Sequence, residues 1–120
     1  MNLIRAANSW KIVRSDKIDP KSLEEYSFDC GYRVNQLCET IDLSEQHLRR
    51  IVTRDIGLSL KAWMNMERMV KARHLLRERR DIESVSAMLR FAHTNSFRRA
   101  FKTTYGVSPS KFLDNERSDI

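Results

Sequence analysis

Apolar residues recur at spacings of three and four from position 32 onward, which is the period of an amphipathic helix. The first series ends at Ile41, and Ser44 then offers a side-chain cap for a second helix that stops at Gly57. This pattern predicts two short helices joined by a turn over residues 32–58. The apolar positions of this pair are Val34, Leu37, Cys38, Ile41, Leu48, Ile51 and Val52.

The pattern continues with a long helix and a second helix pair. Ser59 can cap a helix over residues 60–78, and Asp81 opens a second pair over residues 81–106. Pro109 at a first helical position predicts a closing helix over 108–114. The expected buried side of the long helix comprises Trp63, Met66, Met69, Val70, Ala72, Leu75 and Leu76.

The two ends of the chain carry weaker patterns. Residues 1–22 show only a loose helical spacing interrupted at Pro20, and we treat them as an N-terminal extension of uncertain order. A short helix is predicted over 23–28, and residues 115–120 are treated as a tail. No segment alternates clearly between apolar and polar residues, so the predicted fold is all-α: two helix-turn-helix subdomains joined by a long linker helix.

The two helix pairs are copies of one sequence pattern. Val34 and Leu37 correspond to Ile82 and Val85 at an offset of 48, and the offset becomes 49 after the turn. The shared pair of arginines, and the shared glycine and serine, are unlikely in unrelated helical hairpins. The matches after the turn are Leu48 with Phe97, Arg49 with Arg98, Arg50 with Arg99, Val52 with Phe101, Gly57 with Gly106, Ser59 with Ser108 and Trp63 with Phe112.

Positive charge is concentrated in the later part of the chain. The formal net charge is +6. Residues 1–43 hold 6 basic and 7 acidic residues, whereas residues 44–120 hold 16 basic and 9 acidic residues. A basic region confined to part of a domain is typical of a surface that binds a polyanion, although a solvated basic face has the same composition.

The second helix of each pair exposes side chains that suit base edges. Arginine pairs with guanine, glutamine and asparagine pair with adenine, and serine and threonine contact several bases. In a helix-turn-helix this second helix enters the major groove of DNA. The exposed residues are Glu45, Gln46, Arg49, Arg50 and Thr53 in the first pair, and Thr94, Asn95, Ser96, Arg98, Arg99 and Lys102 in the second.

The chain resembles the DNA-binding domain of the AraC/XylS family of bacterial transcription regulators over residues 32–113. The motif residues that carry the resemblance are Ile82, Val85, Ser86, Arg90, Phe91, Phe97, Phe101, Lys102, Gly106 and Pro109, with Arg68, Met69, Ala72, Leu75 and Leu76 in the long helix. The resemblance implies a DNA-binding domain over residues 23–114. Arg90 stands where the family has glycine, so a left-handed turn there would be strained by about 1 kcal/mol.

The resemblance implies which residues contact DNA. Carried over by position, the base-reading residues are Gln46, Arg49, Arg50, Thr94, Asn95, Ser96, Arg98 and Arg99. The distribution of charge adds Arg54, Arg90 and Lys102 as contacts to phosphates.

The long helix sets the expected binding geometry. A helix of about 19 residues is roughly 28 Å long, which is comparable to the pitch of one DNA turn, about 34 Å. A monomer could therefore read an asymmetric site in two successive major grooves. We expect a transcription activator that binds double-stranded DNA and recruits RNA polymerase, located in the cytoplasm on the bacterial nucleoid.

Other classes of function find little support in the sequence. The three histidines and two cysteines lack metal-ligand spacing, and no catalytic motif or phosphate-binding loop is present. We therefore expect no enzyme activity, cofactor, metal site, membrane span or small-molecule ligand in this chain. The alternative is a helical adaptor that acts on RNA polymerase or on another regulator and binds DNA weakly.

Overall fold

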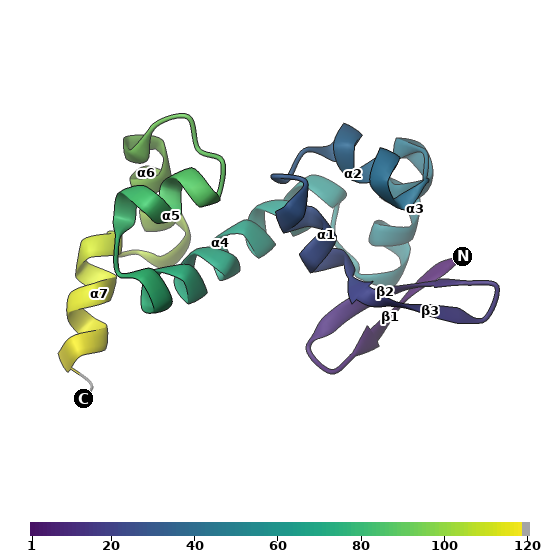
Figure 1. Ribbon diagram of the computed structural model, residues 1–120, viewed down its shortest axis with the longest axis horizontal. Coiled ribbons are helices and arrows are strands. Elements are labelled where there is room, and N and C mark those ends of the chain that lie inside the picture. Colours follow the sequence, from purple (N-terminus) through teal and green to yellow (C-terminus); the bar gives the residue numbers. More distant parts are fainter. Residues whose placement is uncertain (119–120) are drawn as a thin grey trace. The chain divides into compact units, whose positions relative to one another are not determined.

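The computed structural model describes residues 1–118, and over this range it contains three strands and seven helices (Figure 1). The strands are β1 (Asn2–Ala6), β2 (Ser9–Arg14) and β3 (Lys17–Ser22). The helices are α1 (Leu23–Asp29), α2 (Val34–Ile41), α3 (Glu45–Asp55), α4 (Leu60–Arg79), α5 (Ile82–Met88), α6 (Thr94–Tyr105) and α7 (Pro109–Ser118). The chain divides into two units, Met1–Met66 and the part from Glu67 onward.

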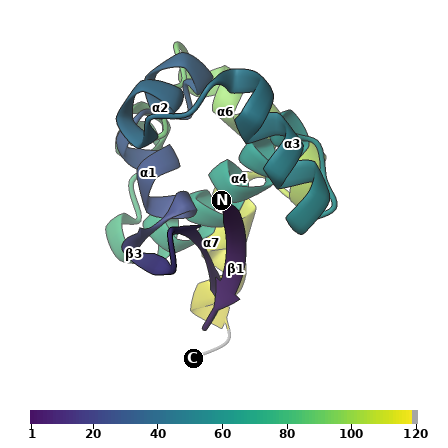
Figure 2. The ribbon, with the colours of Figure 1, turned by 90° about the vertical axis from the view of Figure 1, so that its right-hand side faces the viewer.

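The N-terminal extension is an antiparallel sheet, so the all-α prediction was wrong for residues 2–22 (Figure 2). The strands follow the order β1-β2-β3, with Leu3 opposite Ile12 in the first hairpin. The two turns contain Ala7 at φ 57°, and Ser15 and Asp16 at φ 47° and 65°. Left-handed angles suit tight hairpins. Because these turns contain no glycine, the sequence did not indicate hairpins in this segment.

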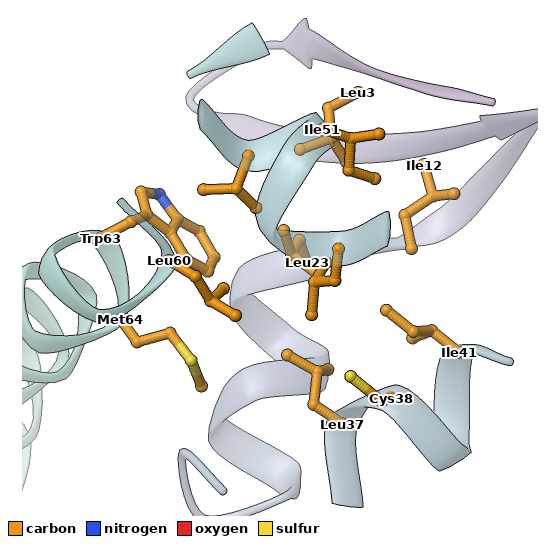
Figure 3. Packing of buried hydrophobic residues seen from close by; sticks show 12 residues of the cluster. Leu3, Ile12, Leu23, Leu37, Cys38, Ile41, Ile51, Leu60, Trp63 and Met64 are labelled. Atoms are coloured by element: carbon orange, nitrogen blue, oxygen red, sulfur yellow. The ribbon is translucent and has the colours of Figure 1, made fainter. Parts of the chain in front are cut away.

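The sheet packs onto α1 and α3 within the first unit. Leu3 and Ile12 are buried among side chains of these helices, including Leu23 and Ile51 (Figure 3). Two main-chain amides are held by carboxylates: the Leu3 N–H donates to Asp55 Oδ2 at 2.8 Å, and the Trp10 N–H donates to Glu24 at 3.0 Å. The burial of Leu3 and Ile12, together with these two hydrogen bonds, stabilises residues 2–22 as a sheet.

The core of the first unit lies between the sheet and the helices α1 to α4. Its buried apolar side chains come from every one of these elements, and Trp63 is the largest of them. Figure 3 shows Trp63, Leu60 and Met64 of α4 facing the same interior as Leu37 and Cys38 of α2. The sheet therefore extends the core of the first helix pair.

The core of the second unit is built around aromatic rings. Phe97 and Phe101 are fully buried, and their ring centres lie 5.9 Å apart. The ring of Phe112 on α7 lies 5.5 Å from Phe101, and that of Phe91 lies 5.4 Å from Phe97. Offset and edge-on aromatic pairs of this kind add to the free energy gained by burial.

Two details of the helices differ from the expected pattern. Met66 was expected to be buried, but its side chain is 45% exposed, because α4 passes at this point from the first unit to the second. Helix α7 continues past the expected end at 114 to Ser118. Of the expected tail, residues 119–120 lie outside the described residues.

Candidate DNA-binding surface

The turns of the two helix pairs begin with the same backbone conformation. The residue after each first helix is left-handed, with φ 55° at Asp42 and φ 65° at Arg90. In both turns the next amide closes back onto the helix: Leu43 N–H donates to Cys38 O at 3.0 Å, and Phe91 N–H donates to Ser86 O at 3.1 Å. These are equivalent helix C-caps. The rest of the turn differs, because the second turn is one residue longer and the Ser44 side chain caps α3, whereas the His93 side chain makes no capping bond to α6.

The ends of the two second helices also correspond. Helix α3 is followed by Gly57 at φ 89°, and α6 by Gly106 at φ 77°. The hydroxyl oxygens of Ser59 and Ser108 then cap the next helix, each accepting a main-chain amide at 3.1 Å. The repeat identified in the sequence is therefore present in the backbone.

Helix α3 presents one polar face to solvent, opposite its buried residues Leu48, Ile51 and Val52. The five residues of this face, which include three of the proposed base readers, line a shallow open depression. They are Gln46, Arg49, Arg50, Thr53 and Arg54, and all are exposed.

Two of these arginines make contacts within the chain. Arg49 donates to Glu45 one helical turn earlier, with an Nη2–Oε1 distance of 2.5 Å. Arg54 donates to both carboxylate oxygens of Asp55, at 2.8 and 3.0 Å, and to the Met1 carbonyl at 3.2 Å. The Arg54 guanidinium holds the pKa of Asp55 below its ordinary value, and the bond from the Leu3 amide acts in the same direction. Arg54 thus links the end of α3 to the residue before β1, a role that the sequence did not suggest.

Helix α6 presents the corresponding face in the second unit. Phe97 and Phe101 point into the core, whereas Asn95, Arg98 and Arg99 are exposed. Arg98 Nη1 donates to Asn95 Oδ1 at 3.1 Å, three residues earlier. The side chains of Thr94 and Ser96 are half-buried, and those of Lys102 and Arg90 are exposed. Each unit therefore brings its proposed base-reading residues onto a single helix.

Arg68 on α4 supports the second turn. Its Nε and Nη2 both donate to the Leu89 carbonyl oxygen, at 2.9 and 2.6 Å, and its guanidinium carbon lies 3.8 Å from the centre of the Phe91 ring. Arg68 was among the residues that matched the AraC/XylS pattern, but no role was predicted for it. It satisfies a carbonyl at the end of α5, directly before the left-handed Arg90.

Within residues 1–118 no cluster of three or more histidine, cysteine, aspartate or glutamate side chains is placed to bind a metal ion. No helix in this range is long and apolar enough to cross a membrane.

Comparison with known proteins decides the family. A model of the helix-turn-helix domain matches residues 37–115, which is well over half of the chain. The chain belongs to the AraC/XylS family of DNA-binding transcription regulators.

Curated relatives agree with this assignment. The chain is 30% identical over 93 residues to the Msm operon regulatory protein of Streptococcus mutans, covering 77% of this chain and 34% of that protein. It is 34% identical over 85 residues to the HTH-type transcriptional activator RhaS of Escherichia fergusonii, covering 70% of this chain and 31% of that protein. The chain thus spans about a third of the length of the curated relatives it matches.

Solved structures show the same fold. The C-terminal domain of the two-component response regulator yesN from Fusobacterium nucleatum aligns with a TM-score of 0.62 at 25% identity, covering 75% of this chain and 88% of that one. The C-terminal domain of AraT, a response regulator from Geobacillus stearothermophilus, aligns with a TM-score of 0.65 at 22% identity, covering 78% of this chain and 81% of that one.

Proposed function

We propose that this AraC/XylS-type chain binds a specific asymmetric DNA sequence as a monomer, with α3 and α6 each entering a major groove. The observation that carries the proposal is the repetition of base-compatible side chains on two exposed helix faces behind equivalent turns. The length of α4 supports two successive grooves, since 20 residues make a rod of about 30 Å, comparable to one turn of B-DNA, roughly 34 Å.

The proposed base contacts fall on the exposed faces of both helices. Arginine donors suit guanine, and the amides of Gln46 and Asn95 suit adenine. Thr94 and Ser96 are half-buried and have short side chains, so they suit contacts with bases that lie close to the helix backbone. The full proposed set is Gln46, Arg49 and Arg50 in the first unit, and Thr94, Asn95, Ser96, Arg98 and Arg99 in the second.

Three further basic residues are proposed to contact phosphates. Lys102 and Arg90 are exposed beside α6 and in its turn. Arg54 can contact a phosphate only while sharing its guanidinium with Asp55. With about six phosphate contacts in the complex, the slope of log K against log salt should be near −5. A slope shallower than about −2 would contradict a surface that follows the DNA backbone.

The decisive experiment is a selection from random duplexes with the purified chain. The expected result is a single motif with two conserved blocks whose centres lie about 10 base pairs apart. If no motif is enriched, the chain is not a sequence-specific reader. A motif with one block would mean that one unit alone reads bases.

We further propose that the bound protein activates transcription by recruiting RNA polymerase. The support is indirect: a relative such as RhaS is named as a transcriptional activator. Transcription in vitro from a promoter carrying the selected motif tests it, with a promoter carrying a scrambled motif as the control. Increased transcript from the first template alone is expected, and a decrease would mean repression.

A further inference from the structure

Glu45 is an acidic residue in the first turn of α3, the helix of the first unit that is proposed to enter DNA. Its carboxylate oxygen Oε1 accepts two bonds from Arg49, from Nε at 3.1 Å and from Nη2 at 2.5 Å. Both side chains are half-exposed, at 54% and 50%. Among the described contacts, the second carboxylate oxygen of Glu45, Oε2, accepts no hydrogen bond. The pair therefore offers a hydrogen-bond acceptor, Glu45 Oε2, beside the Arg49 N–H groups that do not contact Glu45.

Glu45 lies at the edge of the exposed face of α3, one helical turn before Arg49. Arg49 lines the open depression on α3 with Gln46 and Arg50, whereas Glu45 lines a second depression with Glu39 and Asp42. Ser44 fixes the start of α3 by accepting the His47 amide at 3.1 Å. Glu45 therefore projects from a capped first turn, the part of a recognition helix that contacts base edges.

The second unit has no such carboxylate. The residue equivalent to Glu45 is Thr94, and Arg98 is held instead by the neutral amide of Asn95. Phosphates repel a carboxylate near DNA. A carboxylate is therefore favourable there only where it accepts a hydrogen bond that offsets this repulsion. In the major groove the donors are the amino groups of cytosine and adenine, and glutamate pairs typically with cytosine N4. The partner arginine pairs typically with guanine O6 and N7.

We propose that Glu45 and Arg49 act together to select one G·C base pair, with Glu45 Oε2 accepting from cytosine N4 and Arg49 donating to guanine. The proposal rests on the proposed DNA-binding function and adds Glu45 as a specificity-determining residue. The acceptor and the donors then match the two partners of one base pair. The ion pair with Glu45 also orients the Arg49 guanidinium, which leaves its other N–H groups available to guanine.

The test measures base preference at each position of the selected motif. Glu45→Gln keeps the size of the side chain but adds an amide donor, so discrimination of G·C over A·T should fall about tenfold at one position. Arg49→Ala should lose discrimination at the same position, and the double variant should lose little more than the larger single effect, because both residues read one base pair.

Glu39→Gln is the matched control, because it removes the same charge from the exposed surface of α2. It should raise affinity slightly for all sequences and change no base preference. If Glu45→Gln behaves like this control, or relaxes a position different from Arg49→Ala, the proposal is overturned. If the unmodified chain selects no motif, the proposed function itself fails; if it selects a motif that Glu45→Gln leaves intact, only the role of Glu45 fails.

Discussion

Two copies of one backbone are stabilised here by different means. At equivalent positions the first unit has Leu48 and Val52 where the second has Phe97 and Phe101, and all four are fully buried. The first unit is extended by a sheet and by α1, whereas the described residues of the second unit, 67–118, form no strand and end with α7. At these two positions the smaller side chains occur where added elements complete the core, whereas at a third equivalent position the first unit has the larger ring, Trp63 in place of Phe112. A repeated fold can thus be kept while the source of its buried area changes.

The surfaces of the two copies differ as well. Residues 34–55 hold 3 basic and 4 acidic residues, whereas residues 82–105 hold 4 basic and 1 acidic residue. Asp42 and Glu45 in the first copy correspond to Arg90 and Thr94 in the second. We infer that the second copy supplies more of the attraction to phosphates, while the first depends more on matched contacts to bases.

Replacing the central ring of the second core should have the largest effect. Phe101→Ala is expected to lower the free energy of unfolding by about 3–5 kcal/mol, because a fully buried ring leaves a cavity. The equivalent Val52→Ala in the first unit should cost about 2 kcal/mol, since fewer carbons are removed. Urea titration followed by circular dichroism measures both. Equal losses would show that the two cores are equally sensitive to truncation.

Removing one equivalent arginine from each copy should come next. Arg50→Ala and Arg99→Ala should each cost about 1–3 kcal/mol of binding and relax one base position, the two positions lying in different blocks of the site. Competition binding with single-base variants of the site gives these values. As a control, Lys102→Ala should weaken binding to all sequences alike and reduce the salt slope by about 1. The same uniform loss for either arginine would identify it as a phosphate contact.

The bond between the sheet and α3 can be tested by comparing Asp55 with Thr104, the residue at the equivalent position of the second unit. Asp55→Ala should cost about 1–2 kcal/mol of stability, because it leaves the Leu3 amide and Arg54 without their shared carboxylate. Thr104, at the equivalent position, only donates to the Ala100 carbonyl at 3.0 Å, so Thr104→Ala should cost less than about 0.5 kcal/mol. Urea titration of both variants compares them, and similar costs would mean that the sheet adds no stability through Asp55.

The contribution of Asp55 should depend on pH. Its pKa is lowered in the folded chain, first by the Arg54 guanidinium. A lowered pKa means that the stabilisation is present at pH values above the ordinary pKa of aspartate, about 3.9, and is lost as the pH falls through the folded pKa. The difference in stability between the unmodified chain and Asp55→Ala should therefore be constant from pH 7 to pH 5 and shrink below about pH 4. A difference that grows on acidification would contradict the assignment.

The smallest effect is expected at the strained turn. Arg90 has φ 65°, so Arg90→Gly should raise stability by up to about 1 kcal/mol or leave it level, since relief of strain is partly offset by the freedom of glycine in the unfolded chain. Asp42→Gly should gain less, because aspartate tolerates left-handed angles better. Urea titrations measure both, and a clear loss for Arg90→Gly would show that the Arg90 side chain makes a stabilising contact.

The helical part of the protein was predictable from local patterns along the chain. The spacing of apolar residues from Val34 onward predicted the helices, and the glycines at 57 and 106 marked their ends. These signals are local: a helix forms its hydrogen bonds within one segment, and its buried face repeats every three to four residues. The repeat and the AraC/XylS motif likewise needed no knowledge of tertiary contacts.

The strands over residues 2–22 and the partners of the exposed arginines depend on contacts between segments that are distant in the sequence. A strand pairs with another segment, and the sheet here is held by side chains as distant in sequence as Asp55. Its turns place Ala7 and Ser15 at left-handed angles that those residues rarely adopt, so the pattern of the segment alone resembled a weak helix. Likewise, the sequence placed Arg54 on an exposed face, but only the folded chain brings the Met1 carbonyl to it. Such contacts depend on segments that meet only when the chain has folded, and no local period encodes them.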